Sequence, residues 1–399
     1  MKFVVLGDLH LDSREAETFD RARADVRAEA PQALVCLGDL GCGTHSGTRE
    51  SFEDARAYLA SFETDWGTIL GNHDLERVET FATDQAAVAC YCDVFGLAAP
   101  YRTIELGDAL GVLLSSTGFR DNRGYKHEVS IDDAQFAWLR ATLEANRKRP
   151  IFVFSHAPPL GSQLRVLQYP HLRGGNAWLN QSNAPGRFAA LLAEHPQVRL
   201  WFSGHNHLAQ HYEDSASLVG QCLFVHTGVI GSTSRDGAHH SRIVTWDEPI
   251  GPSSGCLRID TLDHGARRVT PSLSFDLVKN ELDRATDAFD EPETTFFAAP
   301  KLAALAEAFE LLRLDTSAFA VHRDMLVEYD TQLNDPVGVV EDWMGRSRAT
   351  IKGNNVVVKS WLGSREISPN ADGYYFQVPA RNPRILNELR EAINRRFGR

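Results

Sequence analysis

The chain opens with a short apolar run that ends in residues able to bind a metal ion: residues 3–10 are FVVLGDLH. The same arrangement, in which Gly or Ser and then Asp, Asn or His follow the run, returns four more times. These copies are ALVCLGD from Ala33, GTILGNHD from Gly67, IFVFSH from Ile151 and RLWFSGHNH from Arg199. Apolar runs without polar alternation are typical of strands covered on both faces. We therefore predict five buried strands with polar residues at their carboxyl ends.

Helical patterns separate most of these runs. Residues 14–30 carry apolar side chains at helical spacing, with Ser13 suited to cap the helix and Pro31 to stop it. Residues 132–146 and 187–195 indicate two further helices. Strands that alternate with helices predict a layered α/β fold, in which ligands bind outside the carboxyl ends of the strands. The five polar clusters are therefore expected to meet at one edge.

The polar residues at the strand ends are of the types that hold metal ions. The seven candidate ligands are Asp8, His10, Asp39, Asn72, His156, His205 and His207. Carboxylates mixed with imidazoles suit Mn, Fe or Zn. Seven ligands are too many for one tetrahedral ion and fit two ions that share a bridge. Two ions ~3.5–4 Å apart can lower the pKa of a bridging water and clamp phosphoryl oxygens.

The order of the motifs resembles that of the calcineurin-like metallophosphoesterase superfamily, whose pattern is D-x-H, G-D, G-N-H-[DE], H and G-H-x-H. Here the motifs are GDLH, GDLG, GNHD, SHAPP and GHNH, and the resemblance covers about residues 1–277. The stretch Ser115–His156 is similar to the class III cyclic-nucleotide phosphodiesterase branch. The resemblance implies a four-layer α/β/β/α sandwich that hydrolyses a phosphoester by attack of metal-bound hydroxide.

The resemblance also implies a role for each residue. Asp39 would bridge both metals. Asp8, His10 and His207 would complete the first site, and Asn72, His156 and His205 the second. The imidazole of His73 would lie outside the metals and act on the leaving oxygen, with Asp74 holding it in orientation.

Five further residues are candidates for substrate binding: Arg120, Arg123, Lys126, Arg173 and His226. The basic side chains could bind a phosphate, although a solvated loop would have the same composition. His226 follows another predicted strand, and a structural role in the core explains it equally well.

Residues 1–277 are expected to form the catalytic domain, residues 278–298 a linker and residues 299–399 a smaller α+β domain. The predicted elements of the smaller domain are helices at residues 301–314 and 384–397 and a hairpin at residues 349–361.

The net charge of -12 disfavours nonspecific binding to nucleic acid. No apolar stretch is long enough to span a membrane, and the six scattered cysteines fit free thiols in a reducing compartment, so we expect a cytoplasmic protein. The expected partner is a small phosphoester substrate, and the branch resemblance implies a phosphodiester of a small or cyclic nucleotide ahead of a nucleic acid. The alternatives are a nuclease, a phosphomonoesterase and a non-catalytic metal-binding scaffold. The sequence leaves the oligomeric state undefined.

Overall fold

A computed structural model describes most of the N-terminal three quarters of the chain. The described residues are 1–119, 127–164, 166, 176–181, 185–211, 213–235, 237–247 and 255–285, with strands at 347–352, 355–360 and 363–367. The chain divides into two compact units, residues 1–164 with 174–289 and residues 165–173 with 290–399. Each unit is described by itself.

The first unit contains a seven-stranded sheet in the order β13-β12-β11-β10-β1-β2-β3. Its strands are β1 (Lys2–Leu6), β2 (Ala33–Cys36), β3 (Asp65–Thr68), β10 (His240–Asp247), β11 (Cys256–Asp263), β12 (Arg268–Asp276) and β13 (Glu281–Arg284). Strands β1, β2 and β3 run parallel, whereas β10 pairs with β1 in the antiparallel direction. The parallel strands therefore have their carboxyl ends at one edge.

A six-stranded sheet has the order β4-β5-β6-β7-β9-β8. Its strands are β4 (Arg102–Leu106), β5 (Ala109–Leu114), β6 (Ile151–Ser155), β7 (Val198–Ser203), β8 (Ala216–Val219) and β9 (Cys222–His226). Strands β5, β6, β7 and β9 are parallel, so this sheet also gathers its carboxyl ends at one edge.

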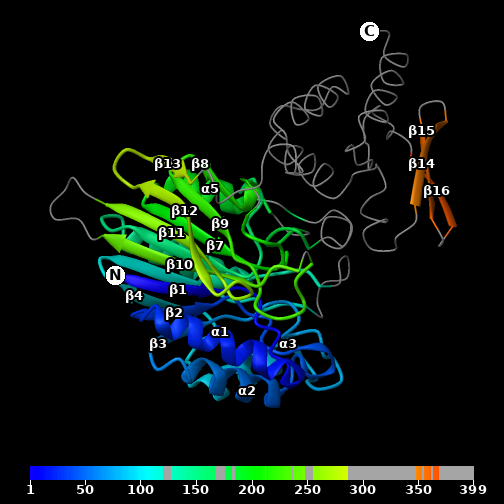
Figure 1. Ribbon diagram of the computed structural model, residues 1–399, viewed down its shortest axis with the longest axis horizontal. Coiled ribbons are helices and arrows are strands. Elements are labelled where there is room, and N and C mark those ends of the chain that lie inside the picture. Colours follow the sequence, from blue (N-terminus) through cyan, green and yellow to red (C-terminus); the bar gives the residue numbers. More distant parts are fainter. Residues whose placement is uncertain are drawn as a thin grey trace, which may run out of the picture. The chain divides into compact units, whose positions relative to one another are not determined.

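Alternation along the strands produces the layers, because successive side chains point to opposite faces of a sheet. Phe3 and Val5 of β1 pack between the two sheets in a cluster that includes Phe154 of β6. Val4 and its neighbours on the other face pack against α1 (Ala16–Ala28), α2 (Arg49–Ala60) and α3 (Asp84–Phe95). Figure 1 shows these three helices together on one side of β1, β2 and β3.

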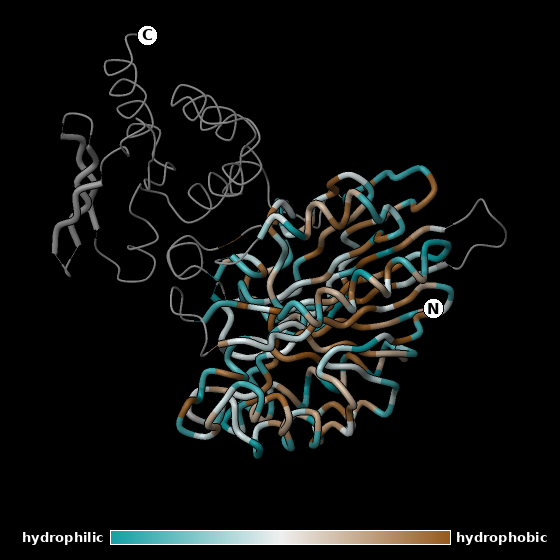
Figure 2. The backbone as a smooth tube through the Cα atoms, turned by 180° about the vertical axis from the view of Figure 1, so that it is seen from behind, coloured by the Kyte–Doolittle hydropathy of each residue, from teal (hydrophilic) through white to brown (hydrophobic). Residues whose placement is uncertain are grey.

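The outer face of the second sheet is covered by α4 (Asp133–Ala145) and α5 (Arg187–Glu194). Helix, sheet, sheet and helix make the predicted four-layer sandwich, which is confirmed. The most hydrophobic segments in Figure 2 are strands in the middle of the unit, and polar segments lie toward its outside.

The three helices predicted between residues 14 and 195 are present with small shifts at their ends. The first begins differently: α1 starts at Ala16, and its N-cap residue Glu15 makes no side-chain capping bond. Ser13 lies in a preceding 3-10 turn, which Asp12 caps by accepting the backbone N–H of Arg14 at 2.9 Å. Asp132 caps α4 by accepting the N–H of Gln135 at 2.7 Å. All six cysteines are free and lie buried or half-buried, as expected.

The boundary predicted at residue 277 is too early. Strand β13 lies inside the stretch predicted as a linker, and it pairs with β12 from Asp276↔Glu281 to Leu273↔Arg284. Leu282 packs against the core between the sheets. The acidic composition of this stretch concealed the strand, because only one of its four residues is apolar.

The second unit is described at β14 (Ser347–Lys352), β15 (Asn355–Ser360) and β16 (Gly363–Ile367), an antiparallel sheet in that order. The pair Lys352↔Asn355 closes the predicted hairpin of residues 349–361. The predicted helices at 301–314 and 384–397 lie outside the described residues. No helix in the described part of the chain is both long and apolar enough to cross a bilayer.

The packing between the sheets predicts a stability effect. Phe154 is fully buried and stacks on Phe202 with ring centroids 5.6 Å apart. Phe154→Ala should cost about 3–5 kcal/mol of unfolding free energy, because the cavity it leaves cannot collapse between two sheets. The exposed control Val278→Ala should change stability by less than about 0.5 kcal/mol. Urea unfolding would measure both, and equal midpoints would contradict the described core.

Candidate metal centre

Five strand ends from the two sheets bring their polar residues together. Two groups of ligand-type residues form there, and within each group the ligand atoms all lie within 4.8 Å of one another. The first group is Asp8, His10, Asp39 and His207, and the second is Asp8, His156 and His205. Asn72 joins the second group, since its Oδ1 is 3.1 Å from His156 Nε2. All seven predicted ligand-type residues are buried. The structure therefore brings them to one place, as the strand-end pattern predicts.

The imidazole rings are oriented by backbone carbonyls. The Nδ1 atom of His10 lies 3.2 Å from Gly41 O, that of His156 2.7 Å from Leu37 O, and that of His207 3.0 Å from Thr233 O. A metal-binding histidine usually donates its second ring N–H in this way, which leaves the other nitrogen free for the metal. The free Nε2 atoms face inward, and those of His10 and His207 are 3.1 Å apart.

Asp39 lies between the two groups. Its Oδ1 accepts the backbone N–H of His73 at 2.9 Å. Its buried Oδ2 has no hydrogen-bond donor among the described residues and lies 3.5 Å from His10 Nε2 and 3.2 Å from His156 Nε2. A buried carboxylate oxygen without a donor is costly unless a cation balances it. The residues present therefore fit a pair of metal ions.

Asp8 is fixed by the loop that carries the last two histidines. Both of its oxygens accept the backbone N–H of His205, at 2.9 and 2.8 Å. Its Oδ1 is also 3.2 Å from His207 Nε2 and 3.6 Å from His156 Nε2.

Four of the ligand-type residues have a left-handed backbone: His10 has φ 40°, Asp39 49°, His205 70° and His207 54°. This region is uncommon for residues other than glycine, and such strain concentrates at functional sites. The turn after each strand is therefore held in a strained form that aims the side chain back over the strand ends.

Glycines in the motifs leave room for the carboxylates. A Cβ on Gly204 would overlap the carboxylate of Asp8, and a Cβ on Gly71 would overlap that of Asp39. The glycines of GHNH and GNHD are thus required by close approach, because each carboxylate packs against the backbone of another motif.

The charges at the centre perturb one another strongly. Burial alone would raise the pKa of Asp8, but the His207 and His156 imidazoles hold it well below its usual range. Burial would lower the pKa of His156, but Asp39 and Asp8 raise it to about 10. Burial lowers the pKa of His10 to about 4. Two buried carboxylates therefore demand positive charge at this point, which divalent cations would supply.

His73 lies at the border of the centre and is half-exposed, with 42% of its side chain accessible. Its ring centroid is 5.4 Å from that of His10. Burial would lower its pKa, but Asp39 and a hydrogen bond with Glu76 raise it to about 9.

The prediction that Asp74 holds the His73 imidazole in orientation is wrong. The Asp74 carboxylate is fully buried and accepts backbone N–H groups of Asp39 at 2.9 Å, Leu40 at 2.8 Å and Gly71 at 2.8 Å. Consecutive residues of the turn point in different directions, so Asp74 ties two loops together while His73 points outward. Burial and the Asp39 charge raise the pKa of Asp74 to about 7.

Two residues near His73 were missed by sequence reasoning. Glu76 Oε2 is 2.8 Å from His73 Nδ1, and Glu76 Oε1 is 2.6 Å from His127 Nδ1. The spacing of three residues between His73 and Glu76 was a usable signal, since a turn brings such residues together. His127 carried no signal, because a long connection places it.

The structure tests one of the candidate substrate contacts. His226 is 1% exposed at the end of β9, and its carbonyl accepts Arg242 Nε at 3.1 Å, which favours a structural role. Arg120, Arg123, Lys126 and Arg173 lie outside the described residues.

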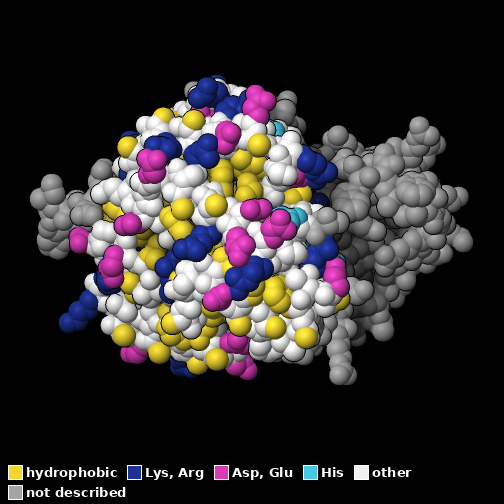
Figure 3. Space-filling view, turned by 90° about the horizontal axis from the view of Figure 1, so that it is seen from below, with side chains coloured by type: hydrophobic (Ala, Val, Ile, Leu, Met, Phe, Trp, Pro, Cys, Tyr) yellow, Lys and Arg dark blue, Asp and Glu magenta, His cyan; other side chains and the backbone are white. Residues whose placement is uncertain are grey.

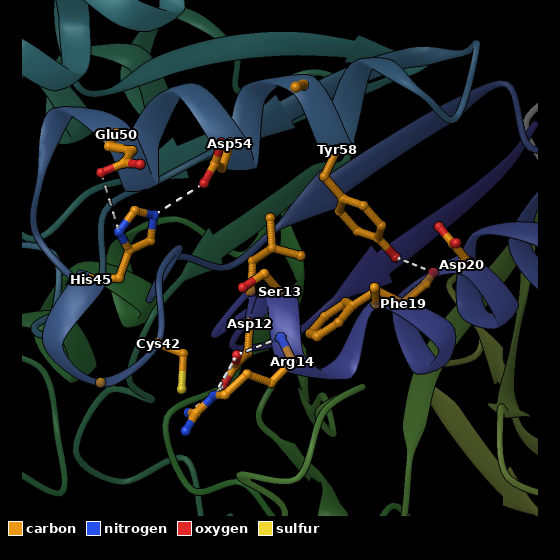
Figure 4. A pocket seen from close by; sticks show the side chains of 14 residues that line it. Asp12, Ser13, Arg14, Phe19, Asp20, Cys42, His45, Glu50, Asp54 and Tyr58 are labelled. Carbon is orange, nitrogen blue, oxygen red and sulfur yellow. Dashed lines mark hydrogen bonds and ion pairs between the residues drawn. The ribbon is translucent and has the colours of Figure 1, made fainter.

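A cavity of about 940 Å³ lies beside the motif loops. Its described lining includes Asp12, Arg14, Cys42, His45 and Tyr58, but none of the seven ligand-type residues. Figure 4 shows its polar groups paired with one another: Arg14 contacts Asp12, and His45 lies 3.1 Å from Asp54 and 3.8 Å from Glu50. The cavity is thus separate from the metal centre.

Comparison with known proteins identifies relatives. A family model described as calcineurin-like phosphoesterase matches residues 1–209. A probable cyclic nucleotide phosphodiesterase of Rhodopseudomonas palustris is 28% identical over 188 residues, which are 44% of this chain and 64% of that protein. A 3′,5′-cyclic-nucleotide phosphodiesterase of Nostoc sp. is 27% identical over 177 residues, which are 44% of this chain and 55% of that protein. The chain thus spans less than two thirds of either relative.

Among solved structures, a dimetal phosphatase from Danio rerio is similar with a TM-score of 0.48 and 14% identity, over 70% of this chain and 98% of that one. The family model matches more than half of the 399 residues and contains all five strand-end motifs. The chain therefore belongs to the calcineurin-like phosphoesterase family.

Proposed function

We propose that this protein is a dinuclear-metal-dependent phosphoesterase that hydrolyses a small phosphodiester, with cyclic nucleotides as the first substrate class. The observation that carries the proposal is the convergence of carboxylate and imidazole groups from five strand ends on one buried point. The two relatives named as cyclic nucleotide phosphodiesterases support the substrate class.

In this proposal Asp39 would hold both metals, because its Oδ2 lies between His10 of one group and His156 of the other. Asp8, His10 and His207 would complete the first site, and Asn72, His156 and His205 the second. Asp8 also approaches both groups, but its two oxygens are engaged by the His205 N–H. The mixed donor set suits Mn, Fe or Zn.

Two such ions, when bound, polarise phosphoryl oxygens and lower the pKa of the attacking water. The chain supplies the rest. His73 is the residue proposed to contact the leaving oxygen, since its ring lies beside His10 and reaches solvent. Its Nδ1 is engaged by Glu76, so its Nε2 is the atom that remains for the substrate. Asp74 is proposed to act through the backbone, by holding the loop of Asp39 against that of Asn72.

The acidic net charge of the chain favours a small ester over a long nucleic acid. On the one face that Figure 3 shows, Lys and Arg side chains are interspersed with Asp and Glu and form no continuous basic track. Nucleic-acid backbones are bound through rows of basic groups that neutralise phosphates. The acidic net charge of -12 points in the same direction.

A panel of phosphoesters tests the proposal. The purified protein would be loaded separately with Mn, Fe, Zn or Mg and given cyclic nucleotides, a chromogenic diester, a chromogenic monoester and short oligonucleotides. We expect turnover of the diesters and about two metal ions per chain. Asp39→Asn should lose metal and nearly all turnover, because the bridging charge is gone.

Cleavage of oligonucleotides alone would instead favour a nuclease, and cleavage of the monoester alone a phosphomonoesterase. Absence of both metal and turnover would leave a scaffold.

Gly204→Ala should disable the centre without touching a ligand. The added methyl group overlaps the Asp8 carboxylate, which must move. We expect metal affinity to fall by roughly 10–100-fold, the range seen when a ligand loses its support. The matched control is Gly186→Ala, since a Cβ there meets nothing within 4 Å. Metal titration followed by calorimetry measures both, and equal affinities would contradict the described packing.

His73→Ala should spare the metals and slow the chemical step by about 10²–10⁴-fold, the usual contribution of a general acid. The loss should be larger for an alkyl ester than for a p-nitrophenyl ester, because the latter leaving group needs no proton. Metal content and kcat on both esters measure this. Loss of a metal ion in the variant would make His73 a ligand instead.

A further inference from the structure

Glu76 forms a bridge between two imidazoles at the border of the metal centre. One oxygen lies 2.8 Å from His73 Nδ1 and the other 2.6 Å from His127 Nδ1. Only 15% of the Glu76 side chain is exposed. Each ring therefore has its Nδ1 engaged, and within the described part of the chain its Nε2 has no hydrogen-bond partner.

The same carboxylate also orients a residue of the metal centre. Asn72 Nδ2 donates to Glu76 Oε1 at 2.6 Å. This contact fixes which end of the amide is which, so that Asn72 Oδ1 faces His156 Nε2 at 3.1 Å. One side chain thus sets the direction of Asn72, His73 and His127.

No neighbouring carboxylate of the same motif shares this task. The carboxylate oxygens of Asp74 accept hydrogen bonds from three backbone N–H groups of the strand-end loops. Glu79 is 64% exposed and contacts Arg77 on the surface. Glu76 is therefore the carboxylate of this turn that contacts His73.

His127 continues outward from the metal centre. Ring centroids are 5.4 Å apart from His10 to His73 and 6.1 Å from His73 to His127. Half of the His127 side chain is exposed, and the ring of Phe119 lies 6.2 Å away on the same border. A group bound at His73 would thus meet His127 next.

The backbone around His127 is held in place. Its φ is 70°, in the left-handed region, which costs free energy for a residue other than glycine. Its carbonyl accepts Asn176 Nδ2 at 3.2 Å, and Asn176 is 6% exposed. The buried Asn176 side chain thus holds the strained backbone of His127 in place. Backbone strain of this kind is common at sites that bind ligands.

We propose that Glu76 is the positioning residue for the catalytic imidazole of His73, and that His127, held by the same carboxylate, is a second imidazole that contacts the substrate. This inference rests on the proposed phosphoesterase function. A competing explanation is that His73, Glu76 and His127 bind a third metal ion, because their ligand atoms lie within 4.8 Å of one another.

Glu76→Gln isolates the contact with His73. Asn72 and His127 both use Oε1, so the glutamine carbonyl is best placed there, and its NH₂ group then replaces the acceptor for His73. We expect two metals to stay bound, KM to change little and kcat to fall by ~10–100-fold. The loss should appear with an alkyl diester and be small with a p-nitrophenyl diester. The matched control, Glu79→Gln, should behave as wild type.

The double variant His73→Ala/Glu76→Gln tests whether Glu76 acts through His73. Residues that act as one unit show non-additive losses, so kcat should equal that of His73→Ala alone. A further loss, or an equal loss on both diesters, would assign Glu76 a merely structural role and overturn the proposal.

His127→Asn tests the second imidazole. Asparagine tolerates the left-handed backbone, so the loop should be kept while the ring is removed. We expect KM to rise roughly tenfold, as for loss of a hydrogen bond to a charged group, with kcat changed much less. An unchanged KM would remove His127 from the substrate site. Three metal ions in wild type and two in Glu76→Gln would establish the third-metal explanation.

Imidazole ¹⁵N NMR of the zinc-loaded protein separates this proposal from the proposed function. Wild type should show Nδ1–H protons on both His73 and His127, and Glu76→Gln should lose that of His73. Nδ1 atoms without protons in wild type would overturn the positioning role whatever the turnover. Protons present without turnover of any ester would instead overturn the proposed function.

Discussion

Two carboxylates, Asp8 and Asp39, are removed from water at the ends of neighbouring parallel strands, and the balance of their charge governs the rest of the site. Their burial is costly because each negative charge loses its hydration. Backbone N–H groups of His205 and His73 recover part of this cost. Imidazoles from both sheets surround what remains, and cations at their centre would complete the compensation. The sandwich is thus arranged so that two sheets deliver opposite halves of one polar centre.

The loops that hold these carboxylates are strained and closely packed. Ligand-type residues adopt left-handed backbones, and motif glycines lie against carboxylates from other motifs. Such an arrangement is kept only where the surrounding structure enforces it. Here the enforcing structure is the aromatic and aliphatic core between the sheets, together with Asp74, which binds three backbone N–H groups. The turns that carry the ligand-type residues therefore depend on the same contacts that stabilise the fold.

Much of the fold and the centre could be predicted from sequence, because each signal lies within a few residues. An apolar run followed by Gly-Asp or Gly-His predicts both a buried strand and polar side chains at the carboxyl edge of the sheet. The directions of side chains within a turn could not be predicted. The sequence suggests that Asp74 orients His73, but the Asp74 carboxylate binds backbone N–H groups, and Glu76 contacts His73 instead. Strand β13 is short and acidic like a linker, and only its pairing with β12 makes it a strand. His127 depends on a tertiary contact with Glu76, which no local pattern encodes.

We propose that Asp39 would hold two metal ions together, and anomalous X-ray diffraction from crystals of the manganese-loaded or zinc-loaded protein would locate those ions. We expect two anomalous peaks ~3.5–4 Å apart, with Asp39 Oδ2 between them and His10 and His156 beside opposite peaks. A single peak, or two peaks that do not share Asp39, would rule out this role for Asp39.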